Sequence, residues 1–223
     1  EYGTPEQIQT YLRPMFTTEE IWCQLFSEPG SGSDLASLST KAVDDGDGFI
    51  VNGQKVWTTL GHLAKWGLIV TRTDPDVPKH RGLTFFIVDM ESDGVDVRPL
   101  RQITGEAEFN EVYFTDVKIP KENILGSLGD GWRVSLAILM NERVAIGGNV
   151  RERGSGAPGH LVQLWNDKEL DDPVSRDKLI KLWIEQEAVR LTNVRAFENR
   201  EKGTPGPEGS TSKLYEAEIN KAS

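Results

Sequence analysis

The sequence predicts an α+β fold in which an antiparallel β-barrel domain is followed by part of an α-helical bundle. Short apolar and aromatic segments, separated by Gly, Asp and Pro, fill residues 21–126. Such spacing without intervening helices is typical of a barrel or sandwich. From Gly129 onward the apolar residues recur at helical spacing instead. We therefore expect a leading helix within 1–20, a middle β-barrel domain over 21–126 and a helical domain over 127–223.

The strands of the middle domain follow from their residue types and their turns. Ile21–Phe26 is short, β-branched and aromatic, which indicates a strand. Phe49–Thr59 contains Asn52-Gly53, so it predicts a hairpin around that pair. Further strands are expected at Trp66–Thr71, Leu83–Asp89, Val95–Arg98 and Phe109–Phe114.

Helices are expected on both sides of the barrel. Thr4-Pro5-Glu6-Gln7 is typical of a helix start, and Pro14 predicts that this helix ends near Arg13. The later helices are predicted over Trp132–Val150, over Pro173–Lys202 and, with Ser210 as the cap, over Ser210–Ser223.

Composition narrows the classes of function and site. The chain has 223 residues and a formal net charge of −10, which argues against general affinity for nucleic acid or anionic lipid. Its apolar runs are much shorter than the roughly 20 residues of a membrane-spanning helix. With Cys23 as its single cysteine, the sequence excludes an internal disulfide and a clustered-cysteine zinc site. The three histidines are too far apart in sequence to suggest a metal site.

Two glycine-rich segments are candidate phosphate sites. Glu28–Asp34 follows a strand directly, and its glycines with Ser31 and Ser33 could direct N–H and O–H groups at a phosphate. On the local pattern alone an ordinary turn is the better interpretation. Gly154–Gly159 matches G-x-G-x-x-G, but it follows a helix rather than a strand. We interpret it as a flexible connector.

An aromatic residue and a charged pair are two further candidates for a functional role. Trp57, followed by Thr58 and Thr59, could face a flat heteroaromatic ring, although the pattern alone favours a core tryptophan. Glu142 and Arg143 lie in an almost wholly apolar helical stretch, which predicts that they are buried. A buried carboxylate beside a cation is either a general base with a raised pKa or half of a structural ion pair, and the pattern leaves both open.

Three motifs together resemble the acyl-CoA dehydrogenase family. They are Leu25-Phe-Ser-Glu-Pro-Gly-Ser-Gly-Ser33-Asp34, Asn52-Gly-Gln-Lys-Val-Trp57-Thr-Thr59 and Phe109-Asn-Glu-Val-Tyr-Phe-Thr-Asp-Val-Lys-Ile-Pro120, in family order and spacing. The resemblance implies an N-terminal helical domain, a middle β-barrel and a C-terminal helical bundle. The chain begins at Glu1 without a signal-peptide pattern. We therefore expect a fragment, inactive alone and not secreted, that holds the last helix of the first domain, the second domain and half of the third.

The activity that the resemblance implies is FAD-dependent dehydrogenation of an acyl-CoA to the trans-2-enoyl-CoA, in fatty-acid β-oxidation. Electrons would pass to an electron-transfer flavoprotein. The family assembles as oligomers of the tetramer type, so a homo- or hetero-oligomer is expected. The compartment would be the bacterial cytoplasm or the mitochondrial matrix.

The resemblance also assigns roles to individual residues. It places Glu142, directly before an arginine as in the isovaleryl- and long-chain-type branch, as the catalytic base. It favours the binding interpretation for both the 28–34 loop and Trp57. FAD would contact Leu25, Phe26, Ser27, Gly32, Ser33, Trp57, Thr58 and Thr59, and the acyl-CoA would contact Ser33, Met140, Asn141 and Arg143.

One family feature is missing. The Arg-x-x-Phe-Gly segment that contacts the FAD of a neighbouring subunit is not found between Gly147 and Asp167. Two alternatives therefore stay open beside the dehydrogenase. One is a non-catalytic or half-site subunit of a hetero-oligomer, and the other is an acyl-CoA oxidase.

Overall fold

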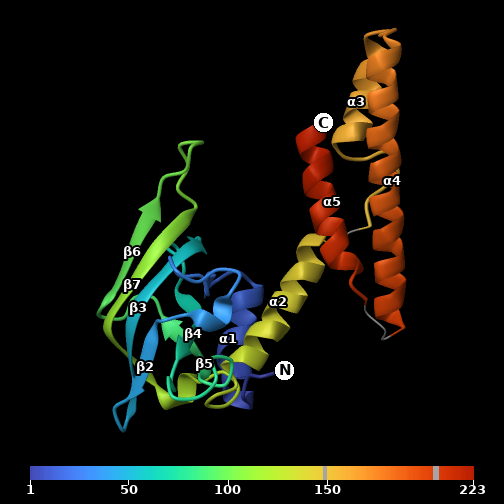
Figure 1. Ribbon diagram of the computed structural model, residues 1–223. Helices are drawn as coiled ribbons and strands as arrows, with labels where there is room; N and C mark the ends of the chain where they lie inside the picture. The colour runs from blue at the N-terminus through green and yellow to red at the C-terminus, as the bar shows by residue number, and fades with distance from the viewer. Residues whose placement is uncertain (148–149, 203–205) are drawn as a thin grey trace. The chain divides into compact units, whose positions relative to one another are not determined.

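The computed structural model describes residues 1–147, 150–202 and 206–223, without the side chains of 143–147 and 209. The chain divides into two compact units, Glu1–Ala137 and Ile138–Ser223. The first contains a curled sheet and the second contains helices (Figure 1). The predicted α+β class is confirmed. Within the described ranges, none of the helices is both long and apolar enough to cross a membrane.

The sheet of the first unit has seven strands, and its pairing is mixed. Its path is β1-β4-β2-β3-β7-β6, with β5 paired to β4. The strands are β1 (Trp22–Leu25), β2 (Lys41–Asp44), β3 (Gly48–Thr59), β4 (Trp66–Arg72), β5 (Leu83–Asp89), β6 (Val95–Leu100) and β7 (Phe109–Pro120). The expected antiparallel pairing holds for most of them, but β1 and β2 each pair with β4 in parallel. Parallel pairing is possible because the chain between β1 and β4 is long enough to cross over.

An apolar cluster packs against this sheet. Buried side chains from β1, β2, β3, β4, β5 and β7 form most of it. It includes Leu25, Phe49, Val51, Ile69, Phe86, Val88, Val112, Phe114, Val117 and Ile119. Burial of this apolar surface is the main force that holds the strands in register.

The predicted Asn52-Gly53 hairpin is wrong. β3 runs unbroken through this pair, and two residues of β7 oppose Asn52 in a bulge. The Asn52 side chain accepts from the backbone N–H of Asp116 at 2.9 Å. A Cβ atom on Gly53 would lie 2.5 Å from the Thr40 hydroxyl oxygen, so the glycine is needed for a close approach, not for a turn.

The first helix, α1 (Pro5–Phe16), begins as predicted but ends later. Thr4 and Gln7 form the capping box. The helix continues through Pro14, because Tyr11 is held against the sheet by edge contacts to Trp22 and Trp66, with ring centroids 5.3 and 5.0 Å away. Tertiary packing therefore outweighs the local proline signal.

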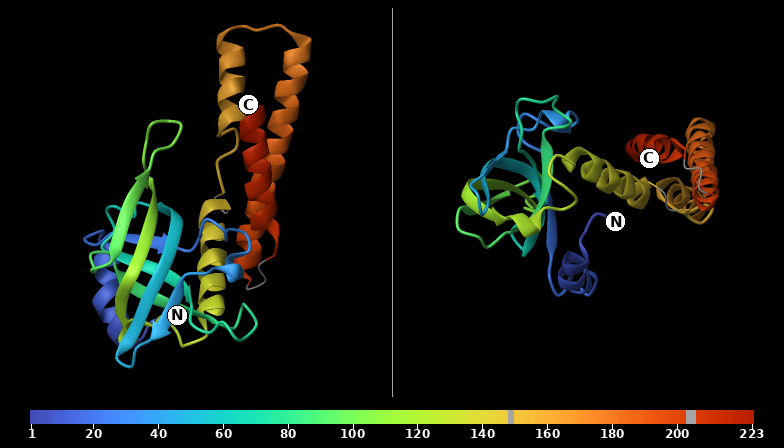
Figure 2. Two further views of the ribbon diagram at one scale, coloured as in Figure 1. Left: turned by 60° about the vertical axis from the view of Figure 1, so that its left-hand side comes forward. Right: turned by 90° about the horizontal axis from the view of Figure 1, so that it is seen from below.

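The second unit contains α3 (Ala157–Asp167), α4 (Pro173–Glu201) and α5 (Glu208–Ala222). α3 and α4 run side by side as a hairpin, and α5 lies along α4 (Figure 2). The prediction for α4 is confirmed. Two predictions here are wrong: Ala157–Gly159 forms the first turn of α3 rather than a flexible connector, and α5 is capped by Pro207, not Ser210.

The helix α2 (Gly131–Gly147) passes from the first unit into the second. It lies within the predicted Trp132–Val150 except for its first residue, Gly131. Its expected complete burial is wrong. Leu136 and Met140 are 42% and 50% exposed, whereas Val134, within the first unit, is buried.

Candidate functional site

The predicted site residues fall into both units. Leu25, Phe26, Ser27, Gly32, Ser33, Trp57, Thr58 and Thr59 belong to the first, and Met140, Asn141, Glu142 and Arg143 belong to the second.

The loop after β1 turns tightly beside β3. Glu28 and Ser31 exchange two backbone hydrogen bonds of 2.8 and 3.0 Å. The Ser27 carbonyl accepts from the backbone N–H of Val56 at 2.9 Å, which places Ser27 next to the residue that precedes Trp57. Gly32 and Ser33 are exposed at the tip. The Ser31 hydroxyl, an expected phosphate donor, instead donates to the Asp34 carbonyl at 2.7 Å.

A buried ion pair anchors this loop to β3. Lys55 is 0% exposed, and its Nζ donates to Glu28 Oε1 at 2.9 Å and to the Phe26 carbonyl at 3.1 Å. The other carboxylate oxygen of Glu28 accepts from the backbone N–H and the hydroxyl of Ser39, at 2.6 and 2.8 Å. The backbone N–H of Thr40 donates to Oε1 at 3.0 Å. Four polar groups therefore hold one buried carboxylate, which anchors the base of the loop to the core.

The electrostatics of the pair follow from this geometry. Burial alone raises the pKa of Glu28, but the charge of Lys55 and the hydrogen bonds from Thr40, Ser39 and Lys55 outweigh it and lower the pKa to about 2. Burial lowers the pKa of Lys55 to about 8, partly opposed by Glu28. At neutral pH the pair is ionised.

A second clamp holds the other end of the loop. The Arg72 guanidinium donates to the carbonyls of Ala36, Leu38 and Lys79. Lys79 Nζ in turn bonds both carboxylate oxygens of Asp34 at 2.7 Å. The 28–38 segment is therefore fixed at both ends, while its glycine tip stays open: a Cβ atom on Gly30 or Gly32 would meet nothing within 4 Å.

Sequence reasoning missed the roles of Glu28, Lys55 and Arg72. The signal for Lys55 was its place in a strand whose alternate residues, Phe49 and Val51, face the core. A lysine at an inward position requires a buried anion. The signal for Arg72 does not exist in the sequence, because its acceptors are backbone carbonyls.

Trp57 lies on the outside of a bulge. Val56 and Trp57 of β3 together oppose one residue of β7. Trp57 has a φ of 62° and is 62% exposed, with an edge contact to Phe109 at 6.1 Å between ring centroids. A core tryptophan is therefore excluded.

The residues around Trp57 alternate in direction. Thr58 is 0% exposed, whereas Thr59 is exposed. Leu25 and Phe26 are 0% and 7% exposed, and Phe26 packs on Phe85. A ligand could meet Leu25 and Phe26 chiefly through their main chain. The site therefore offers an outward indole, exposed hydroxyls and an open glycine loop.

On α2, Met140 and Asn141 are exposed and Glu142 is half-buried. The side chain of Arg143 lies outside the described residues. The apolar pattern of this helix predicts full burial of Glu142, but the structure leaves its side chain only half-buried.

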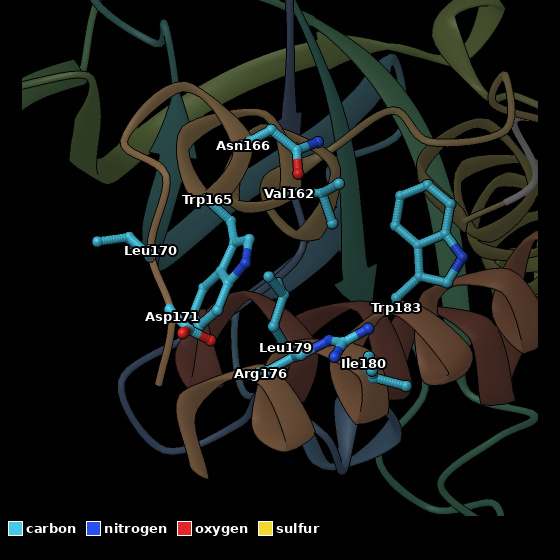
Figure 3. Close-up of a pocket in the computed structure, with 9 residues that line it drawn as sticks. All are labelled: Val162, Trp165, Asn166, Leu170, Asp171, Arg176, Leu179, Ile180 and Trp183. Carbon is cyan, nitrogen blue, oxygen red and sulfur yellow. The ribbon is translucent and has the colours of Figure 1, made fainter. Parts of the chain in front are cut away.

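A separate hollow lies within the helical unit. Its volume is about 360 Å³, and Trp165 of α3 and Trp183 of α4 form two of its walls, with Arg176 beside them (Figure 3). None of the predicted site residues lines it.

Comparison with known proteins matches both parts of the chain. Residues 23–117 match the acyl-CoA dehydrogenase middle domain and residues 129–222 the C-terminal domain. Acyl-CoA dehydrogenase FadE34 of Mycobacterium tuberculosis is 46% identical over 220 residues, which is 96% of this chain and 30% of that protein. Acyl-CoA dehydrogenase IpdE1 of the same organism is 39% identical over 215 residues, 96% of this chain and 56% of that protein.

A solved structure agrees with these matches. The Tcur3481-Tcur3483 steroid ACAD superposes with a TM-score of 0.85 and 29% identity, over 98% of this chain and 57% of that one. The chain thus spans between 30% and 57% of the length of the relatives named here. With both domains matched in order, the chain belongs to the acyl-CoA dehydrogenase family.

Proposed function

We propose that the full-length protein catalyses FAD-dependent α,β-dehydrogenation of an acyl-CoA thioester to the trans-2-enoyl-CoA and passes the electrons to an electron-transfer flavoprotein. The observation that supports this most is the outward indole of Trp57, held at a φ of 62° beside the anchored Ser27–Ser33 loop. Packing in a hydrophobic core does not require an outward-facing tryptophan, whereas a planar cofactor would stack on its exposed ring.

The residues of the first unit fit FAD. The exposed face of Trp57 suits an isoalloxazine ring, and the exposed hydroxyl of Thr59 suits its heteroatoms. The open glycines at 30 and 32 leave the backbone accessible, as a pyrophosphate requires, and Ser33 supplies a hydroxyl. Leu25, Phe26 and Thr58 would contribute backbone groups, because their side chains are buried. When bound, FAD would accept a hydride from the substrate's β-carbon.

Glu142 would remove the α-proton of the substrate. The acyl-CoA thioester makes that proton acidic enough for a carboxylate base, provided that water is excluded. In the proposal, Met140 and Asn141 line the acyl chain, Ser33 bonds the CoA arm, and Arg143 tunes Glu142 and binding. Arg143 cannot replace the base, since a guanidinium stays protonated.

The test is bleaching of the bound flavin when acyl-CoA is added to the full-length protein without an acceptor. Glu142→Gln should keep both ligands but slow bleaching by about 10²–10⁴-fold. Glu198→Gln, on the exposed surface of α4, is the matched control and should bleach at the parent rate. Bleaching of Glu142→Gln at the parent rate would place the base elsewhere.

Two observations support a second candidate, a half-site subunit of a hetero-oligomer. The steroid ACAD with which this chain superposes carries a two-component name, and the Arg-x-x-Phe-Gly segment is missing from Gly147–Asp167. Flavin bound by the full-length protein alone would exclude this candidate. Flavin bound only after a partner is added would favour it. The substrate panel should include a steroid side-chain CoA thioester beside straight-chain ones.

Peroxide released during turnover would indicate an acyl-CoA oxidase rather than electron transfer to a flavoprotein.

The relatives with a named organism in these comparisons are bacterial, so we place the protein in a bacterial cytoplasm rather than in mitochondria.

A further inference from the structure

The bulge that carries Trp57 needs support from outside its own sequence. Trp57 and Leu60 have φ angles of 62° and 55°, in the left-handed region that glycine occupies most readily. Neither is a glycine, so each conformation is unfavourable by itself. The Thr58 hydroxyl, buried between them, has no hydrogen-bond partner among the described residues.

The β3–β7 ladder pairs Thr58 with Asn110 and Thr59 with Phe109. Beyond this ladder, one buried side chain, that of Asn110 of β7, adds support. It is 0% exposed. Its amide nitrogen donates to the Thr58 carbonyl at 2.9 Å and to the Glu108 carbonyl at 3.2 Å. The Glu108 carbonyl also accepts from the backbone N–H of Leu60 at 2.9 Å. Asn110 therefore joins the end of β3 to the start of β7, and its partner Glu108 also holds Leu60, the first residue after β3.

His62 completes the arrangement. Both contacts of the Asn110 nitrogen are to carbonyls, which only accept, so the amide oxygen must face the other way. There it lies 3.2 Å from His62 Nδ1, which therefore donates to it. Gly61 closes the space, since a Cβ atom on it would lie 3.4 Å from Asn110 Cβ. The three polar functions of the amide are all used, and its orientation is determined.

We propose that Asn110 is a positioning residue for the flavin edge of the site: its amide, oriented by His62, holds the bulge that turns the Trp57 indole outward. The flavin part rests on the proposed function above. Asn110 touches neither ligand nor reacting atoms in this proposal. It acts through the Thr58 carbonyl on the two residues, Trp57 and Thr59, that flank it.

The position of Trp57 can be tested without cofactor or activity. The chain is labelled with 5-fluorotryptophan, and the Trp57 line is identified by its loss in Trp57→Phe. Asn110→Leu, of similar size but without an amide, should shift or broaden the Trp57 line and leave the other tryptophan lines in place. The control is Asn123→Leu, which removes an amide that donates to the Ile87 carbonyl at 2.9 Å in the same unit. It should leave the Trp57 line unchanged.

His62→Ala serves if Asn110→Leu does not fold. His62 is exposed, so its loss should be tolerated, and it should move the Trp57 line in the same direction by a smaller amount. An unchanged Trp57 line in a folded Asn110→Leu, or in His62→Ala if the first variant is unfolded, overturns the proposal.

FAD titration of the full-length protein separates this proposal from the proposed function. Asn110→Leu should raise the Kd for FAD at least tenfold, whereas Asn123→Leu should not. A shifted Trp57 line together with a parent protein that binds no FAD supports the positioning role and counts against the flavin site. If the parent binds FAD and Asn110→Leu binds it with the same Kd, the flavin part of the proposal is overturned.

Discussion

Replacement of Lys55 by methionine should lower the free energy of unfolding of the first unit far more than the loss of an exposed charge does. Lys55 is 0% exposed and the Glu28 side chain 4% exposed, with 2.9 Å between Nζ and Oε1. Methionine fills the space of the lysine stem but leaves the carboxylate buried and uncompensated. Breaking a buried pair in this way costs about 3–5 kcal/mol. The bonds from Ser39 and Thr40 remain, so we expect the lower end of that range.

The assay is urea unfolding of the parent and variants, followed by circular dichroism at pH 7. The matched control is Lys79→Met, which breaks the Lys79–Asp34 pair at 2.7 Å, whose side chains are 45% and 60% exposed. An exposed pair contributes about 0–1 kcal/mol. The double variant Glu28→Gln/Lys55→Met should regain part of the lost stability, because no buried charge is left. If Lys55→Met costs no more than Lys79→Met, the buried pair does not anchor the loop and our reasoning fails.

Two other predictions concern the same unit. The pKa of Glu28 is about 2 in the folded state against an ordinary 4.5, because Lys55 and hydrogen bonds lower it despite the opposing effect of burial. The stability that the ionised Glu28 contributes is therefore complete above pH 4.5 and is lost as the pH falls toward 2. The urea midpoint of the parent should fall across that window more steeply than that of Glu28→Gln/Lys55→Met, and parallel curves would contradict the assignment. Gly131→Ala should destabilise the first unit by about 1–3 kcal/mol, because a Cβ atom would lie 2.7 Å from the Leu83 carbonyl carbon and from the Thr84 nitrogen. Gly30→Ala, whose Cβ atom would meet nothing within 4 Å, is its control in thermal unfolding and should be close to neutral; equal melting temperatures for the two variants would refute the packing argument.

The sequence by itself determined the elements whose signals are local. Leu83–Asp89 is a strand at the predicted residues, and α4 begins at Pro173 as predicted, because Asp172 caps it and proline fits the first turn. The three motifs were enough to identify the family, since each places several residue types at set spacing. These features depend on neighbours along the chain, which a sequence displays directly.

Tertiary structure decided everything that depends on residues far apart in the sequence. Asn52-Gly53 became a bulge because Thr40 and Asp116 approach it, and α1 passed through Pro14 because the ring of Tyr11 packs on two tryptophans. The motif glutamate Glu28 acquired its role only when the sheet brought Lys55 to it. We trace the direction of Trp57 likewise to Asn110, whose amide bonds the Thr58 carbonyl from 52 positions further along the chain. Conformations that are unfavourable alone persist where distant contacts hold them, and a linear pattern does not contain those contacts.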